Sequence, residues 1–109
     1  MSAEYQIPGR VPDPLDREAV SRYWRGRFAS EPYYSAGARF EDYEPAYYAG
    51  HEARIREFGR AYEQVEKELQ ERWERERGER SPAWAQVREA MKRAWEEAGR
   101  IGPDAPRGM

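Results

Sequence analysis

Three segments of the chain, FEDYEPAYYAGH (40–51), YEQVEKELQERW (62–73) and WAQVREAMKRAW (84–95), decide the fold because they share one pattern. Each begins with an aromatic residue, and successive segments begin 22 residues apart. Apolar residues follow at offsets of 3, 7 and 11, except that a histidine takes the last place in the first segment. These offsets lie on one face of a helix with about 3.6 residues per turn. The sequence therefore predicts three amphipathic helices, one from each copy of a 22-residue repeat.

The aromatic and apolar positions of the repeat form most of the predicted core. One helix cannot bury such a face alone, so the copies are expected to stack on one another. A tryptophan from an earlier helix is expected to join them. The predicted core is Trp24, Phe40, Tyr43, Tyr47, Tyr62, Val65, Leu69, Trp73, Trp84, Val87, Met91 and Trp95. His51 occupies a core position of the repeat, which favours a packed structural histidine.

The chain is predicted to form one small domain, since 109 residues leave little room for two. We expect an all-α, four-helix assembly within residues 13–98, with the helices at about 14–28, 42–58, 62–77 and 82–98. A loop at 29–40 is expected to bury at least one of its two adjacent tyrosine rings, which would tie the loop onto the helices. Proline and glycine near the ends predict an extended arm at 1–12 and a flexible tail at 99–109.

Capping residues and helix breakers support these boundaries. Asp13 is the expected N-cap of the first helix, with Asp16 bonding back from the third helical position. Ser81 is the expected N-cap of the last helix. Pro45 is expected in the first turn of its helix, where a missing N–H is tolerated. Gly50 is unfavourable inside a helix, and we expect it to mark a close helix crossing or a kink.

The charged residues nearly cancel, with 19 Lys and Arg against 21 Asp and Glu. This balance argues against a purely electrostatic binder of nucleic acid or of a membrane surface. Most of the cations are arginines, which stack on aromatic rings and form two-pronged pairs with carboxylates. On the helix surfaces we expect glutamate-first pairs four residues apart, namely Glu52–Arg56, Glu63–Lys67, Glu68–Arg72, Glu71–Arg75 and Glu89–Arg93.

Most catalytic chemistry is disfavoured by the residues present. There is no cysteine and a single histidine, so thiolate metal sites and common hydrolytic triads lack their groups. No glycine-rich phosphate-binding motif occurs. We therefore expect no enzyme activity, no catalytic residue, no metal site and no cofactor. No apolar run is long enough to cross a membrane, and no signal peptide is visible, so a cytoplasmic protein is expected.

Arginines and aromatic rings alternate in the segment 22–39, which gives two functional hypotheses. The first is a non-enzymatic protein-interaction or structural module that presents an aromatic and arginine surface to a protein partner or to a second copy. The alternative is a nucleic-acid-binding protein that uses this segment, since arginine pairs with phosphate and rings stack on bases. A purely structural interpretation is that the rings of Tyr23, Trp24 and Phe28 anchor the core and that the arginines pair with the acidic helices. The candidate interaction residues are Tyr5, Ile7, Arg22, Arg25, Arg27, Tyr33 and Tyr34.

The stretches YWRGRFASEPYYSAGARFEDYEPAYYAGHEAR (23–54), YEQVEKELQERWERERG (62–78) and SPAWAQVREAMKRAW (81–95) resemble a small family of uncharacterised bacterial proteins. The shared features are a Tyr-Trp pair, a tyrosine pair, DYEPAYxxG and two helices that end in tryptophan. The resemblance implies an association with stress responses, and it implies no catalytic residue. The family often has an aromatic residue at the position of His51.

Overall fold

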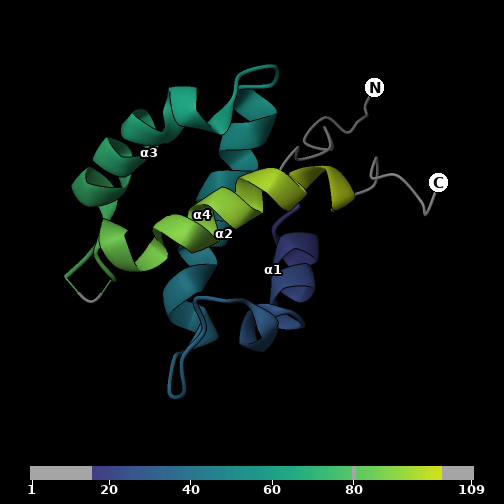
Figure 1. Cartoon of the computed structure of the whole chain (residues 1–109), viewed down its shortest axis with the longest axis vertical. Helices are drawn as coiled ribbons and strands as arrows, with labels where there is room; N and C mark the ends of the chain where they lie inside the picture. Colours follow the sequence, from purple (N-terminus) through teal and green to yellow (C-terminus); the bar gives the residue numbers. More distant parts are fainter. Residues whose placement is uncertain (1–15, 80, 102–109) are drawn as a thin grey trace, which may run out of the picture.

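The computed structural model describes residues 16–79 and 81–101, and this part of the chain is all-α, with no β-strand. The described residues form four α-helices, which Figure 1 labels in chain order. Their bounds are α1, Arg17–Arg25; α2, Phe40–Arg56; α3, Tyr62–Glu76; and α4, Trp84–Glu97. Two short 3-10 helices follow α1 and α4, namely η2, Phe28–Ser30, and η3, Ala98–Arg100. The predicted all-α assembly of four helices is confirmed.

The helices that carry the sequence pattern begin at its leading aromatic residues. α2 starts at Phe40, α3 at Tyr62 and α4 at Trp84. Every residue of the predicted core is buried, and so is His51. The pattern therefore gives the buried face of each helix correctly. That the three helices are copies of one repeat stays a prediction.

The centre of the fold is a close crossing of α2 and α4, two helices that are not neighbours in the chain. Figure 1 shows α4 running across α2, and these two helices share the most extensive contact in the molecule. Gly50 of α2 lies at the contact, where a Cβ atom would collide with the carbonyl oxygen of Met91 and lie 2.9 Å from the Cβ atom of Ala94. Only glycine allows the backbones to approach this closely. The expected close crossing at Gly50 is thus confirmed.

α1 packs on α2 through stacked aromatic rings. The indole of Trp24 is parallel to the ring of Tyr47, with an interplanar angle of 1° and ring centroids 4.5 Å apart. Farther along, the ring of Phe28 contacts the rings of Phe40 and Tyr43 at centroid distances of 5.8 and 5.0 Å. Trp24 and Tyr47 are fully buried, so this stack joins the N-terminal segment to the centre of the fold.

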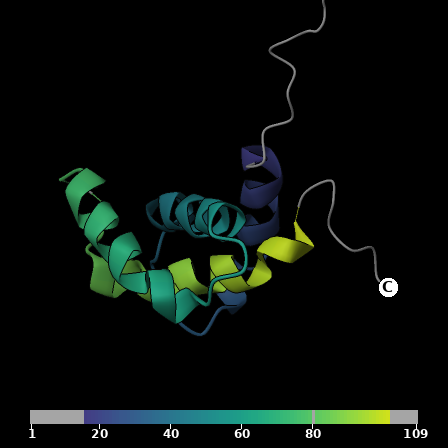
Figure 2. The ribbon, with the colours of Figure 1, turned by 90° about the horizontal axis from the view of Figure 1, so that it is seen from above.

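α3 is held differently, by a single stripe of apolar residues. It runs antiparallel along α4, because Tyr62 at its start contacts the ring of Trp95, and Glu74 near its end contacts the start of α4 at Trp84. The indole N–H of Trp73 donates to the Pro82 carbonyl oxygen at 2.8 Å. Figures 1 and 2 show α3 and α1 on opposite sides of the α2–α4 pair, with α3 standing away from α2 along much of its length.

The start and end of the first helix differ from the prediction. Asp16 is itself the N-cap of α1, since its carboxylate accepts from the Ala19 N–H at 3.1 Å, so it is not the third helical residue. Asp13 lies outside the described residues. The helix ends at Arg25 rather than at 28, because the chain turns at Gly26 and enters a 3-10 turn that buries Phe28.

The later boundaries are corrected for similar reasons. α2 begins two residues earlier than expected, so Pro45 lies in its second turn rather than its first. Ser81 does not cap α4, because its hydroxyl accepts from the Gly78 N–H at 3.3 Å. The first amide of α4, at Trp84, donates instead to the carboxylate of Glu74 in α3, at 3.0 Å. A side chain distant in sequence thus caps this helix.

Two further expectations fail within the described residues. The first three residues of the expected flexible tail, 99–101, belong to the folded part, where Ile101 is buried. None of the five glutamate-first pairs forms an ion pair within residues 16–79 and 81–101. Arg72 pairs with Glu76 instead of Glu68, and Arg93 pairs with residues from two segments of the chain. Spacing along one helix therefore does not predict the ion-pair partners of these arginines, because contacts in the folded structure decide them.

Candidate functional site

The arginines of the segment 22–39 largely cover the protein's own rings. The guanidinium of Arg25 lies 4.6 Å from the ring centroid of Phe40, and it faces Glu41 at 3.8 Å. The guanidinium of Arg27 lies 4.6 Å from the ring centroid of Tyr23 and donates to its hydroxyl at 2.6 Å. Arg22 is exposed on α1. Tyr5 and Ile7, the candidates in the N-terminal arm, lie outside the described residues.

The two adjacent tyrosines of the loop are anchored on the helices to different degrees. Tyr33 is half-buried, with its ring stacked on Tyr43 and its hydroxyl hydrogen-bonded to the hydroxyl of Tyr47. Burial raises the pKa of the Tyr33 hydroxyl, and the hydrogen bond to Tyr47 adds to the increase. Tyr34 is 37% exposed and packs edge-on against Phe28. The prediction that at least one of the two rings is buried is therefore wrong, because each ring packs on the core with only part of its surface.

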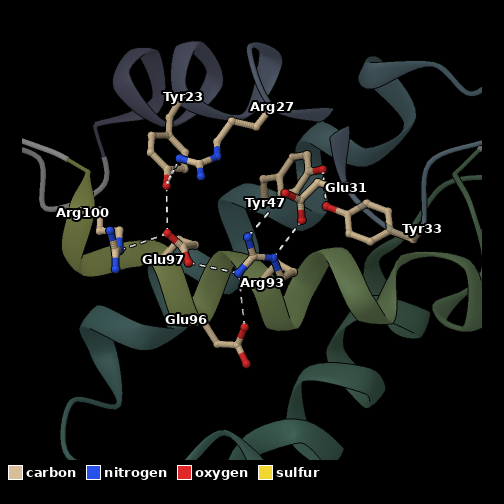
Figure 3. Close-up of polar contacts among 9 residues, drawn as sticks. All are labelled: Tyr23, Arg27, Glu31, Tyr33, Tyr47, Arg93, Glu96, Glu97 and Arg100. Carbon is tan, nitrogen blue, oxygen red and sulfur yellow. Dashed lines mark hydrogen bonds and ion pairs between the residues drawn. The ribbon is translucent and has the colours of Figure 1, made fainter. Parts of the chain in front are cut away.

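Arg93 of α4 is the centre of a polar network that ties the loop and α1 to the crossing (Figure 3). Its guanidinium donates to the buried carboxylate of Glu31 at 2.8 Å and to Glu97 at 3.0 Å. Glu97 also accepts from the Tyr23 hydroxyl at 2.8 Å. Arg100 pairs with the same carboxylate at 3.2 Å. Four segments of the chain thus meet around one arginine.

The charges of this network are held in their ionised forms. The hydrogen bond to Glu31 is the main cause of the raised pKa of the Arg93 guanidinium. Burial acts to raise the pKa of the Glu97 carboxyl, but hydrogen bonds from Tyr23 and Arg93 outweigh it and lower the pKa below its ordinary value. A carboxylate in this state is a poor general base. The network therefore has the character of a structural clamp.

His51 is the one histidine, and its surroundings favour packing. It is buried, and its Nδ1 atom makes no hydrogen bond to any described residue. Burial lowers the pKa of the imidazole, so the ring is neutral at pH 7. Within residues 16–79 and 81–101, no group of three His, Cys, Asp or Glu side chains could hold a metal ion.

A groove lies between α2 and α3, and its floor reaches α4. Its more apolar hollow measures about 230 Å³ and has a floor that includes Leu69, Trp73 and Met91. Charged side chains of both signs form the rim, including Glu52 and Arg56. The complete lining is Pro45, Ala49, Glu52, Arg56, Leu69, Arg72, Trp73, Glu76, Arg77, Gly78, Ser81 and Met91.

A second, more polar hollow continues this groove toward the turn between α2 and α3. The two hollows share Arg56, Leu69 and Arg72, and the second also includes Glu57 and Val65. We call the two together the α2–α3 groove. Its lining extends from Gly78 and Ser81 in the α3–α4 connection to Glu57 at the α2–α3 turn.

An exposed aromatic residue stands at the turn end of this groove. Phe58 is 83% exposed and directly follows Glu57, and Ile55, one turn earlier, is 41% exposed. Our interpretation of the sequence did not include either residue among the interaction candidates. The available signal was that Phe58 and Ile55 fall outside the three repeated segments, where the core pattern gives them no partner.

Comparisons of the chain with protein-family models, with curated proteins and with solved structures found no match. The family resemblance seen in the sequence therefore stays a prediction. Of the helices in residues 16–79 and 81–101, none combines the length and the apolar character that a membrane crossing needs.

Proposed function

We propose that this protein is a non-enzymatic protein-interaction module that binds a protein segment in the α2–α3 groove. The observation that carries the proposal is a hollow of about 230 Å³ between two charged walls, with an apolar floor of Leu69, Trp73 and Met91, whose side chains are themselves almost completely buried. Apolar floors with polar rims are typical of protein contacts, where a few buried side chains supply most of the binding free energy. The association with stress responses rests on the sequence resemblance alone.

The size of the groove limits what it can hold. The apolar hollow of about 230 Å³ is smaller than the roughly 300–1,000 Å³ of common small-molecule sites, and the hollow of about 320 Å³ that continues it is lined mostly by charged side chains. It suits one aromatic or large aliphatic side chain. The rim then offers both signs of charge, with Arg72 and Glu76 paired at 3.2 Å. The partner we propose is therefore a polypeptide that inserts one apolar side chain and places charged residues around it.

The groove is favoured over the segment 22–39 because the side chains of that segment are used internally. The rings of Trp24 and Phe28 are buried. Arg25 and Arg27 lie over rings of this same chain. A binder of single-stranded nucleic acid needs such rings exposed for stacking. The nucleic-acid alternative thus has less support than a protein contact.

The test uses NMR of the ¹⁵N-labelled full chain with N-acetyl-L-phenylalaninamide as the probe. We expect the indole N–H signal of Trp73 to shift and to saturate in the millimolar range, because its ring lines the groove and its N–H has a fixed acceptor. Ala49→Gln is the matched control, since a longer side chain at this groove-lining position should block the probe. Shifts that avoid the groove, or that survive Ala49→Gln, would overturn the proposal.

A second arm of the test adds a short single-stranded RNA instead of the probe. Under the proposal the signals of Arg22 and Tyr34 stay unchanged. If these signals shift, and the shifts weaken steeply as salt is raised, then nucleic-acid binding through the segment 22–39 replaces the proposed function.

A further inference from the structure

We propose that the aromatic rings between α1 and α2 form an oxidation relay, in which Tyr23 repairs a radical on the buried Trp24. When Trp24 has lost an electron, Tyr23 supplies the replacement and its phenol proton passes to Glu97. The relay takes a small one-electron oxidant and is reset by a small hydrogen-atom donor of the ascorbate class. It lies away from the α2–α3 groove and does not depend on the proposed function.

Rings in direct contact lead from the interior of the protein toward solvent. The indole of Trp24 is fully buried and stacks on the ring of Tyr47, with centroids 4.5 Å apart. The ring of Tyr23 meets the same indole edge-on at 5.1 Å, and Tyr23 is partly exposed. The chain has no cysteine, so its 4 tryptophans and 8 tyrosines are the main side chains that a one-electron oxidant attacks. A single ring contact thus joins a partly exposed phenol to the most deeply buried of the tryptophans.

The hydroxyl of Tyr23 already has a proton acceptor. It donates to a carboxylate oxygen of Glu97 at 2.8 Å and accepts from Arg27 at 2.6 Å (Figure 3). Burial raises the pKa of the Tyr23 hydroxyl, and the hydrogen bond to Glu97 adds to the increase, so the phenol is protonated at neutral pH. Oxidation of Tyr23 must therefore release a proton. A phenol that has lost an electron is a strong acid, and it transfers this proton even to a carboxylate as weakly basic as that of Glu97.

Each step of the relay balances in electrons and protons. The oxidant removes one electron from Trp24 and leaves an indole radical cation. Tyr23 gives one electron to the indole and one proton to Glu97, which leaves a neutral indole, a tyrosyl radical and a carboxylic acid. The hydrogen-atom donor then restores the phenol O–H, and the carboxylic acid loses its proton to water. Overall, one electron moves from the donor to the oxidant and one proton is released.

The other contacts between tyrosine and tryptophan rings lack a carboxylate. The ring of Tyr62 meets that of Trp95 with centroids 5.7 Å apart, but the Tyr62 hydroxyl is buried and makes no hydrogen bond to any described residue. A positive charge held on such a ring would be costly, because no group nearby takes the proton. The hydroxyl of Tyr47 bonds to another tyrosine hydroxyl, which is neutral. In the described part of the chain, the acceptor therefore distinguishes Tyr23 from the other tyrosines that contact a tryptophan ring.

The first experiment oxidises the full-length protein by one electron and locates the products. Photo-excited tris(bipyridyl)ruthenium(II) with persulfate supplies the oxidant, and peptide mass spectrometry gives the oxidised fraction of each tryptophan and tyrosine. In the wild type we expect products on Tyr23 and little oxidation of Trp24. In Tyr23→Phe, which keeps the ring and lacks the hydroxyl, the oxidised fraction of Trp24 should rise about tenfold, because the repair step loses a hydrogen bond to a charged group.

Tyr48→Phe is the matched control. Tyr48 also donates to a carboxylate, that of Glu44, at 2.8 Å, but its ring stacks on no tryptophan of the described residues. This variant should leave the oxidised fraction of Trp24 unchanged. N-Bromosuccinimide, which labels exposed tryptophans, measures whether Trp24 has become accessible, and circular dichroism verifies that each variant keeps its helices. A rise in Trp24 oxidation that is matched by a rise in this labelling would show lost cover rather than lost repair, and it would overturn the proposal.

Glu97→Gln tests the proton step, because it keeps the shape of the side chain and removes the basic carboxylate. Electron paramagnetic resonance of samples frozen after brief oxidation measures the yield of tyrosyl radical. We expect a lower tyrosyl yield and more oxidised Trp24 than in the wild type, with unchanged N-bromosuccinimide labelling. An unchanged tyrosyl yield in Glu97→Gln, or equal oxidation of Trp24 in the wild type and in Tyr23→Phe, would overturn the proposal.

Discussion

The α2–α4 crossing and α3 use the same spacing of apolar residues and reach opposite kinds of packing. At the crossing, Gly50 and small side chains such as Ala94 let two helices come into close contact. In α3, large residues such as Trp73 form one stripe against α4, and the side toward α2 is a groove. Small residues thus make a closed contact that serves stability, whereas large residues in a single row hold a helix and leave an open surface.

The difference also concerns which parts of the chain each region joins. The crossing is reinforced by the Arg93 network, which gathers α1, the loop and η3 around α4. α3 has mainly its apolar stripe, the cap that Glu74 provides to α4 and the pair between Arg88 and Glu66. Regions with fewer buried contacts open at lower free energy, and binding surfaces are drawn from them. Substitutions in each region test this contrast.

The largest effects are expected for the two tryptophans at equivalent pattern positions, Trp95 in α4 and Trp73 in α3. Replacing either by alanine should lower the free energy of unfolding by roughly 3–5 kcal/mol, because a large buried side chain is lost and a cavity remains. Urea denaturation followed by circular dichroism measures the loss. Unchanged stability of both variants would show that the alignment of the three segments, which makes Trp73 and Trp95 equivalent core residues, is wrong.

At the crossing itself, Gly50→Ala should lower the free energy of unfolding by about 2–3 kcal/mol. The new Cβ atom would meet the Met91 carbonyl oxygen, and overpacking a tight backbone contact outweighs the helix preference of alanine. Gly99→Ala is the matched control, since a Cβ atom there meets nothing within 4 Å and stability should hardly change. Equal midpoints of thermal unfolding for the two variants would show that α2 and α4 can move apart at the crossing without loss of stability.

A smaller loss, about 2 kcal/mol, is expected for Arg93→Met. The substitution leaves the buried Glu31 carboxylate without its cation, although the partial exposure of Arg93 lets water compensate in part. Adding Glu31→Leu to Arg93→Met should recover part of the loss, because the unpaired charge is then removed. Thermal melts of the single and double variants provide the comparison. A double variant less stable than Arg93→Met would show that the clamp acts through shape rather than charge.

The smallest effect is a pH dependence from His51. Burial lowers the folded-state pKa of the imidazole, so as pH falls below its ordinary value of about 6.5 the unfolded chain binds a proton first. Stability is therefore full above pH 6.5 and falls toward pH 5, by at most about 1.4 kcal/mol per pH unit. Thermal midpoints of wild type and His51→Leu between pH 5 and 7.5 test this. The lowered pKa of the Glu97 carboxyl acts only at more acidic pH. Equal slopes for both proteins would exclude His51 as the source.

Particular residues show how much of the fold and of the candidate site the sequence predicts. The offsets of 3, 7 and 11 identified the buried face of three helices, since helix periodicity is a local property. Gly50 also gave a usable signal, because glycine inside a helix needs a reason. By contrast, the expected interaction surface at Arg25 and Arg27 is mostly used to cover Tyr23 and Phe40. The candidate groove was not predicted at all.

The sequence by itself determined that the described chain is helical and which face of three of its helices is buried, because these follow from residue spacing over a few turns. Tertiary structure alone decided that α2 pairs with α4 rather than with α3, that Glu74 caps α4 and that Arg93 pairs with Glu31. These partners lie far apart in the sequence, and no local pattern ranks one buried face against another. The groove and the exposed Phe58 follow from that choice of partners, because a stripe that packs on α4 leaves the α2 side of α3 uncovered.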